Sequence, residues 1–151
     1  MNAESARPAR PTDCPCGGAA PNRASSAKPP RYAQCCGRFI DGGESPPSAL
    51  ELMRSRYTAY VLGEVAYLRA TWASETCPHD LDVEPAAPGA PRWLGLAIRR
   101  HTVIDATHAE VEFVARYKSG GRAFRLHESS RFVRDGSDGR WRYVEGDVSE
   151  R

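Results

Sequence analysis

Four of the five cysteines form two close pairs, a pattern that could hold a metal ion. One pair lies in T-D-C-P-C-G-G and the other in Q-C-C-G-R-F-I, with eighteen residues between them. Zinc prefers four soft ligands at the corners of a tetrahedron, each sulfur about 2.3 Å away. Because four protein ligands leave no position open for a substrate, such a site is structural. The sequence therefore predicts one structural zinc ion bound by Cys14, Cys16, Cys35 and Cys36.

The expected compartment favours a metal over disulfides at these cysteines. The first residues contain no apolar run, so we expect neither a signal peptide nor a transmembrane segment, and predict a cytoplasmic protein. In that reducing compartment, paired cysteines are more often metal ligands than structural disulfides. The C-x-x-C spacing typical of redox centres is absent, and we interpret Cys77 as a spare thiol.

A carboxylate near the C-terminus is the second candidate for chemistry. Leu126, Glu128, Ser130 and Phe132 alternate with other residues, which puts all four on one face of a predicted strand. If Leu126 and Phe132 face the core, Glu128 faces it too. A buried carboxylate is costly unless it has a cation or several hydrogen-bond donors as partners.

Two interpretations of Glu128 remain open. In the first, it is a structural acid that ties a helix to the sheet, with Arg54 or Arg56 as its cation. In the second, it forms the polar floor of a ligand pocket together with Ser130 and nearby aromatic residues. The residues assigned to such a pocket are Arg54, Tyr57, Trp72, Trp93, Glu128 and Ser130.

Two helices are expected before the sheet. Ser48 and Glu51 form a capping-box pattern that predicts a helix start, and Gly63 ends or breaks that helix. Residues 65–72 indicate a second, shorter helix, and residues 73–92 contain four prolines and predict a long loop. Apolar residues recur at helical spacing in the first helix: Leu50, Met53, Tyr57, Tyr60 and Val61.

After residue 92 the apolar period changes from 3.6 to 2, which indicates β-strands. Turn sequences at 119–121 and 135–139 separate the later segments, so consecutive strands are expected to pair in antiparallel fashion. The predicted fold class is α+β, with N-terminal helices packed on a curved, cone-like antiparallel sheet and a small zinc-binding module before them. A cavity or a filled core is expected between helices and sheet.

Several segments resemble known families. The C-P-C-G opening, the C-C-G close and Tyr32 before it resemble a SEC-C motif, a short zinc-binding module. The rest of the chain resembles the bacterial YchJ family of uncharacterised proteins. That resemblance implies a SEC-C module followed by a domain of the nuclear-transport-factor-two-like fold, with no established activity. It rests on L-M-R-S-R-Y-T-A-Y, A-T-W, W-L-G-L, V-E-F-V-A-R-Y, H-E-S-S-R-F and W-R-Y-V-E-G.

The predicted organisation has three parts. Residues 1–12 are expected to be disordered, residues 13–40 to form the SEC-C-like zinc-binding module, and residues 45–151 to form the α+β domain. The spacer between the cysteine pairs is longer than the family's and lacks its Lys-rich stretch. Because the connecting stretch D-G-G-E-S-P-P has little to bury, we expect module and domain to unfold separately.

These features favour a binding or adaptor protein over an enzyme. The SEC-C resemblance implies a protein partner for the module, whose basic side chains are Arg23, Lys28, Arg31 and Arg38. One alternative is a small-molecule enzyme of isomerase or dehydratase type with Glu128 in the cavity. A second is nucleic-acid binding through the zinc module, although the net charge of +2 and the lack of a dense basic block argue against it.

Overall fold

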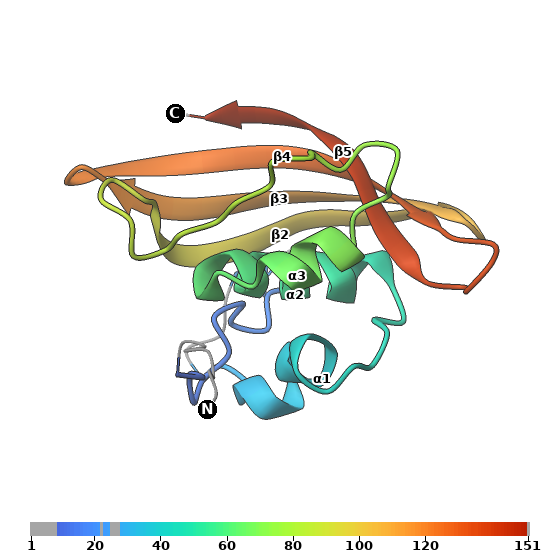
Figure 1. Ribbon diagram of the computed structural model, residues 1–151, viewed down its shortest axis with the longest axis horizontal. Coiled ribbons are helices and arrows are strands. Elements are labelled where there is room, and N and C mark those ends of the chain that lie inside the picture. Colours follow the sequence, from blue (N-terminus) through green and yellow to red (C-terminus); the bar gives the residue numbers. More distant parts are fainter. Residues whose placement is uncertain (1–8, 22, 25–27, 151) are drawn as a thin grey trace.

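The computed structural model describes residues 9–21, 23–24 and 28–150. A layer of helices packs against one face of a long antiparallel sheet (Figure 1). The helical elements are η1 (Tyr32–Gln34), α1 (Gly37–Ile40), α2 (Ala49–Leu62) and α3 (Val65–Ala70). The strands are β1 (Arg23–Ala24), β2 (Arg92–Asp105), β3 (His108–Ser119), β4 (Arg122–Arg134) and β5 (Trp141–Glu150). The predicted α+β fold class is confirmed.

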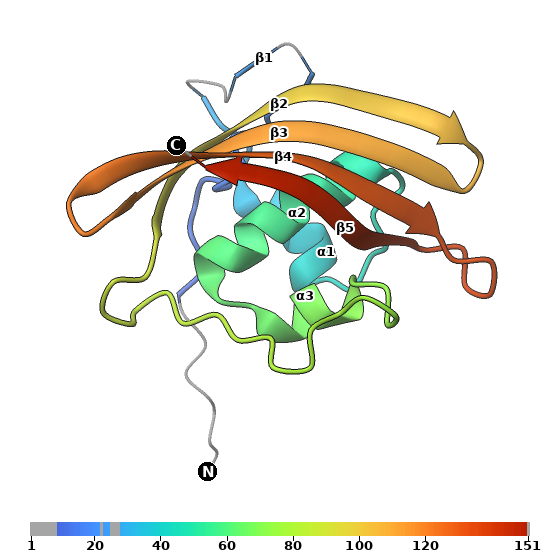
Figure 2. The ribbon, with the colours of Figure 1, turned by 90° about the horizontal axis from the view of Figure 1, so that it is seen from above.

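The strands follow one another in the sheet in chain order, from β1 to β5, and every neighbouring pair is antiparallel. Figure 2 shows the four long strands curving over the helices. Gly120 and Gly121 connect β3 to β4 with φ of 58° and 80°, the left-handed region that a two-residue hairpin turn requires. A bulge between Arg131 and Phe132 shifts the register of β4 against β5.

Helix α2 begins and ends where the sequence predicts. The Ser48 hydroxyl accepts the backbone N–H of Glu51 at 3.3 Å, which is the N-cap bond of a capping box, and donates to the Glu51 carboxylate at 2.8 Å. Gly63 follows the last turn with φ of 76°, a conformation that favours glycine. Among the described residues, no helix has both the length and the apolarity needed to span a bilayer.

The core lies between α2 and the concave face of the sheet. The strand residues that alternate inward pack against the apolar side of α2, as period-two patterning requires. Burying such side chains stabilises the fold by roughly 1.5–3 kcal/mol each. The largest fully buried apolar side chains are Leu52, Leu68, Leu96, Ile98, Val111 and Phe132.

The cysteine segment shares this core. The four paired cysteines belong to the same buried cluster as Leu52 and Tyr57 of α2. Arg54 donates from Nη1 to the carbonyl of Ala19 at 2.9 Å, and the Thr58 hydroxyl of α2 lies against the cysteine sulfurs. This packing does not fit the expectation that the module and the domain unfold separately, because α2 packs against both the cysteine segment and the sheet. The boundaries at 13–40 and 45–151 stay a prediction.

The N-terminal stretch predicted to be disordered lies partly outside the described residues, which begin at residue 9. Arg10, which lies inside them, forms ion pairs with Asp41 at 2.8 Å and Glu64 at 2.7 Å, and its guanidinium lies over the Tyr32 ring. The backbone N–H of Tyr32 also donates to the carbonyl of Thr12 at 2.9 Å. These contacts hold residues 10–12 against the helices, contrary to the prediction of disorder.

Candidate functional site

The four paired cysteines meet at one point. Their sulfur atoms all lie within 4.8 Å of one another, and all four residues are buried. The Sγ atoms of Cys16 and Cys35 are 3.6 Å apart. Sulfurs at tetrahedral corners about 2.3 Å from one zinc ion would lie about 3.8 Å apart, so the cluster matches the size of such a site. Cys77 is outside the cluster and lies near Arg69.

Tight turns aim the sulfur atoms at one another. After the first pair, the backbone N–H of Gly17 donates to the carbonyl of Cys14 at 2.9 Å, and that of Gly18 donates to the Cys16 sulfur at 3.3 Å. From α2, the Thr58 hydroxyl donates to the Cys36 sulfur at 3.3 Å. Nothing in the sequence indicates that Thr58 contacts the cysteines. Thr58 lies on α2 among residues whose pattern predicts only a buried helix face.

The thiols influence one another's ionisation. Hydrogen bonds from the three neighbouring cysteines lower the pKa of Cys14, whereas the same neighbourhood and burial raise the pKa of Cys36. Four thiolates this close would repel one another unless a cation lay between them. The cluster is therefore suited to bind a metal ion, which would let all four sulfurs ionise.

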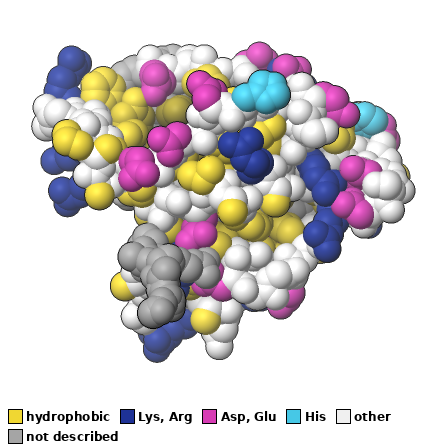
Figure 3. Space-filling view, in the orientation of Figure 1, with side chains coloured by type: hydrophobic (Ala, Val, Ile, Leu, Met, Phe, Trp, Pro, Cys, Tyr) yellow, Lys and Arg dark blue, Asp and Glu magenta, His cyan; other side chains and the backbone are white. Residues whose placement is uncertain are grey.

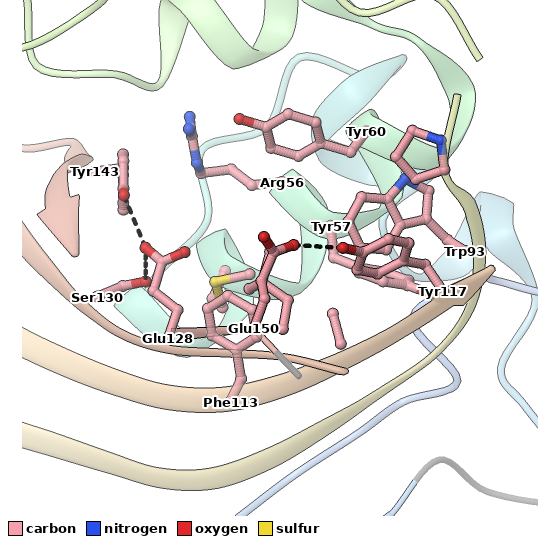
Figure 4. A pocket seen from close by; sticks show the side chains of 14 residues that line it. Arg56, Tyr57, Tyr60, Trp93, Phe113, Tyr117, Glu128, Ser130, Tyr143 and Glu150 are labelled. Carbon is pink, nitrogen blue, oxygen red and sulfur yellow. Dashed lines mark hydrogen bonds between the residues drawn. The ribbon is translucent and has the colours of Figure 1, made fainter. Parts of the chain in front are cut away.

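A second site is a cavity of about 330 Å³ between α2 and the concave face of the sheet (Figure 4). This volume lies within the ordinary range for small-molecule sites. Of the residues predicted to form a pocket, Tyr57, Trp93, Glu128 and Ser130 line this cavity. The lining residues that the prediction did not include are Met53, Arg56, Tyr60, Pro91, Phe113, Ala115, Tyr117, Leu126, Tyr143 and Glu150.

Glu128 faces the cavity from β4, as its alternation predicts. One carboxylate oxygen, Oε2, accepts the hydroxyl of Ser130 at 2.8 Å and that of Tyr143 at 2.7 Å. Neither predicted arginine forms an ion pair with it among the described residues, so hydroxyl donors take the place expected for a cation. A Cβ added at Gly146 would overlap the carboxylate, which shows that Glu128 crosses the backbone of β5 at a position where only glycine leaves room.

Arg54 is wrong as a pocket residue, and Arg56 takes that position. Two steps along a helix turn a side chain by about 200°, so Arg54 faces the cysteine segment and Arg56 faces the cavity. Arg56 is only 3% exposed, and its Nη1 donates to the carbonyl of Leu68 at 2.9 Å and the hydroxyl of Thr71 at 2.7 Å. Burial lowers the pKa of Arg56, and the nearby tyrosines and Glu128 oppose this shift.

Trp72 also does not line the cavity, because it lies behind Arg56. The guanidinium carbon is 4.7 Å from the centre of the Trp72 ring and 4.6 Å from that of Tyr143. The two rings meet edge to face, with centres 5.0 Å apart. Backbone hydrogen bonds of 2.8 Å from Tyr143 to Thr71 and from Ala73 to Tyr143 fix this end of β5 beside α3. Trp72 thus positions Arg56 instead of contacting the cavity.

Aromatic rings form the wall at the other end of the cavity. Trp93 packs edge to face against Tyr57 of α2, with ring centres 5.8 Å apart, and in a tilted arrangement against Tyr117 of β3, with ring centres 5.2 Å apart. The Tyr117 hydroxyl donates to the Glu150 carboxylate there, as Figure 4 shows. Burial raises the pKa of Tyr57, so its hydroxyl stays protonated at neutral pH. Period-two alternation could have identified Tyr117, whereas nothing in the sequence indicates that Glu150 reaches it.

Charged side chains also occur on the surface away from the cavity. On the outer face of the sheet His127 lies 2.7 Å from the Glu112 carboxylate, and both side chains are partly exposed. In the orientation of Figure 1, the space-filling view shows charged side chains spread over the surface, with apolar side chains visible between the sheet and the helices (Figure 3). Arg56, which is buried and faces the cavity, differs from these exposed charged residues.

Comparisons with known proteins place this geometry in context. Residues 48–146 match the family model described as YchJ, middle NTF2-like domain. The chain is 54% identical over 144 residues to a UPF0225 protein of Cupriavidus metallidurans, covering 93% of this chain and 92% of the relative. It is 53% identical over 148 residues to a UPF0225 protein of Ralstonia nicotianae, covering 94% and 95%.

Two solved structures are similar in fold. The solution structure of a SEC-C motif containing protein from Rhodopseudomonas palustris is 31% identical, with a TM-score of 0.69 over 80% of this chain and 94% of that one. The crystal structure of a SEC-C motif containing protein from Psychrobacter arcticus is 29% identical, with a TM-score of 0.68 over 91% of this chain and 82% of that one. Both likenesses agree with the cysteine cluster and the helices under a curved sheet.

Proposed function

The chain belongs to the YchJ family, and on that premise we propose that it is a zinc-stabilised binding protein whose cavity takes a small molecule. One zinc ion at Cys14, Cys16, Cys35 and Cys36 fixes the N-terminal segment on α2. The same helix carries Arg56 into the cavity. The metal therefore acts on the binding site through the position of α2 and not through contact with the ligand.

Zinc is proposed because the donor set is four thiolates. Soft sulfur ligands in a tetrahedral arrangement suit zinc, and a site with four protein ligands is structural. The Thr58 hydroxyl on the Cys36 sulfur and the Gly18 N–H on the Cys16 sulfur supply the outer hydrogen bonds that orient such ligands. When bound, zinc would neutralise the repulsion among the sulfurs and hold residues 13–40 in place.

The observation that carries the binding proposal is that a buried arginine and a half-buried glutamate face one cavity without pairing. Arg56 and Glu128 line the same apolar cavity without forming an ion pair with each other. Buried charges are costly unless they are paired or solvated. Ligand sites are typically preformed cavities lined by apolar and aromatic side chains. A few polar groups in them, such as Arg56 and Glu128 here, orient the bound molecule.

Native mass spectrometry of the metal-loaded chain tests this proposal. We expect an added small-molecule mass, or fragments that bind and shift the NMR signals of Phe113 and Tyr143. Ala115 lines the cavity and is only 2% exposed. Ala115→Leu should therefore abolish binding, whereas Ala123→Leu, at an exposed position of β4, should not. No bound mass and no fragment that distinguishes these two variants would contradict the proposal.

A protein partner for the zinc module is a second candidate function. It is supported by a groove beside the cysteines, where Arg31, Tyr32 and Arg38 lie near Asp41 and Glu44. Pulldown with and without a chelator tests it, with Arg38→Ala in the groove and Arg125→Ala on the sheet as a matched pair. Capture that depends on zinc and on Arg38 would support an adaptor.

An enzyme of isomerase or dehydratase type remains the alternative. Its general base would be Glu128, whose Oε1 atom accepts none of the hydrogen bonds recorded among the described residues. The described lining residues include no histidine to act as a second proton-transfer group. Turnover of a small molecule that is lost in Glu128→Gln would favour this alternative over simple binding.

A further inference from the structure

We propose that the cavity selects a small, planar, uncharged molecule that carries a carbonyl next to an N–H, as amides and lactams do. In this assignment the carbonyl accepts hydrogen bonds from Arg56 and the N–H donates to Glu128. The inference rests on the proposed function, since it names the class of molecule that the same cavity would bind.

The two charged groups are held apart by their own partners. Arg56 is fixed on the α2 side by the Leu68 carbonyl, the Thr71 hydroxyl and the rings that flank its guanidinium. Glu128 is fixed on the sheet side by Ser130 and Tyr143. Because each group is fixed by its own partners, a molecule in the cavity can lie between them and bond to both.

The free hydrogen-bonding positions define what the bridge needs. Both bonds to Glu128 end on Oε2, which leaves Oε1 to accept from a ligand. The hydrogen bonds from Arg56 to Leu68 and Thr71 both start at Nη1, and the Tyr60 hydroxyl lies beside the guanidinium in Figure 4, so the remaining N–H groups are left for a ligand. The ligand must therefore offer an acceptor at one edge and a donor at the adjacent edge.

Charge balance favours a neutral ligand. Arg56 and Glu128 face the cavity with opposite charges, while the third ionised lining residue, Glu150, accepts the Tyr117 hydroxyl at the aromatic end. An anion would gain from Arg56 but be repelled by Glu128, and a cation would meet the reverse situation. In a low-dielectric cavity either added charge is costly to desolvate. A neutral molecule with a donor and an acceptor satisfies both groups without that cost.

The walls favour a flat ring. Aromatic side chains pack well against planar groups. Those that line the cavity include Phe113, Tyr57, Tyr60 and Tyr143. The volume of about 330 Å³ is at the small end of ligand sites. One or two rings that carry the amide group fit that space.

Three probes of nearly equal shape test the assignment: benzamide, benzoate and benzamidine. Benzamide is neutral, benzoate is negative and benzamidine is positive. Only benzamide offers a carbonyl beside an N–H. Protein-observed NMR titrations of the zinc-loaded full chain give a Kd for each. We expect benzamide to bind at least about tenfold more tightly than either charged probe, with the shifts at Phe113, Tyr143 and Glu128.

Variants make the test independent of probe size. Glu128→Gln removes the negative charge and should reverse the order in favour of benzoate, by about tenfold. Arg56→Met should favour benzamidine, and if that variant does not fold, Glu128→Gln decides alone. Glu112→Gln makes the same change on the outer face of the sheet and should keep the wild-type order.

Three results would overturn the inference. They are benzoate or benzamidine binding best to the wild-type protein, an order that Glu128→Gln leaves unchanged, and no binding of any probe at the cavity. Binding of a charged probe, or of another molecule detected by native mass spectrometry, would leave the proposed binding function standing. The two proposals can therefore fail separately.

Discussion

Single atoms decide what each site can do. In the cysteine cluster, four sulfurs within 4.8 Å form a donor set of the right size for one ion. In the cavity, two hydroxyl groups hold one oxygen of Glu128 and leave the other to the cavity. Both arrangements use short side chains at fixed backbone positions, so small substitutions can test them.

At the cysteines we expect one equivalent of zinc per chain. Cys36→Ser should reduce the bound metal to well under one equivalent, because a neutral hydroxyl is a poor replacement for a thiolate. Cys77→Ser serves as the control, since Cys77 lies outside the cluster and should retain full binding. Metal analysis with a thiol-reactivity assay measures both. Four freely reactive thiols in the wild-type protein would refute the site.

At Glu128 we expect Glu128→Gln to lower the free energy of unfolding by about 1 kcal/mol. The hydroxyl groups of Ser130 and Tyr143 would donate to a neutral acceptor instead of a charged one, and Arg56 would lose a nearby negative charge. Urea denaturation of the zinc-loaded protein measures the change, with Glu112→Gln as the control. Equal or higher stability would mean that the carboxylate is kept for binding at a cost to the fold.

Between elements, the contact of β4 with β5 restricts the cavity. Ser130 of β4 pairs with Gly146 of β5, and the Glu128 carboxylate lies over that glycine. Any side chain at position 146 would have to displace the Glu128 carboxylate. Glycine is therefore required at position 146 because the Glu128 side chain needs the space, and not because a turn needs its backbone conformation.

We therefore expect Gly146→Ala to destabilise the protein by about 1–3 kcal/mol through overpacking. The loss should largely disappear when Glu128→Ala is present, because the group that collides with the new methyl is gone. A double-mutant cycle by chemical denaturation measures this coupling. Equal costs of Gly146→Ala in both backgrounds would show that the glycine is needed for some other reason.

Over the whole molecule, α2 joins the two sites. One side of the helix meets the cysteine segment through Arg54 and Thr58, and another side carries Tyr57 and Arg56 to the cavity. Arg10 extends this connection, since it bridges Asp41 beyond α1 and Glu64 before α3. We therefore expect loss of a bound metal ion to lower the stability of the α+β domain.

We expect chelation to lower the midpoint of a single thermal transition, with no separate transition for residues 13–40. The shared buried cluster makes the four cysteines part of one core, and a metal ion that binds only the folded state would raise stability. Cys35→Ser should reproduce the effect of the chelator. If calorimetry finds the main transition unchanged by the chelator and by Cys35→Ser, the module and the domain unfold independently.

The sequence by itself determined the local features. The two cysteine pairs, the capping box at Ser48 and Glu51 and the alternation that turns Glu128 inward all depend on neighbours in the chain. Such patterns show which face of an element is buried, because helices and strands have fixed periods. They therefore predicted the α+β fold, the helices before the sheet and four of the cavity residues.

Only the tertiary structure decided which residues from distant segments meet. Periodicity does not show how far the sheet curls or how α3 packs on β5, and these decide that Arg56 faces the cavity while Arg54 faces Ala19. They also bring Glu150 to Tyr117 and Thr58 to the cysteines. The linker around residues 41–47 suggested separate parts, but the apolar surface of α2 is large enough to bury both, and burial sets the final arrangement.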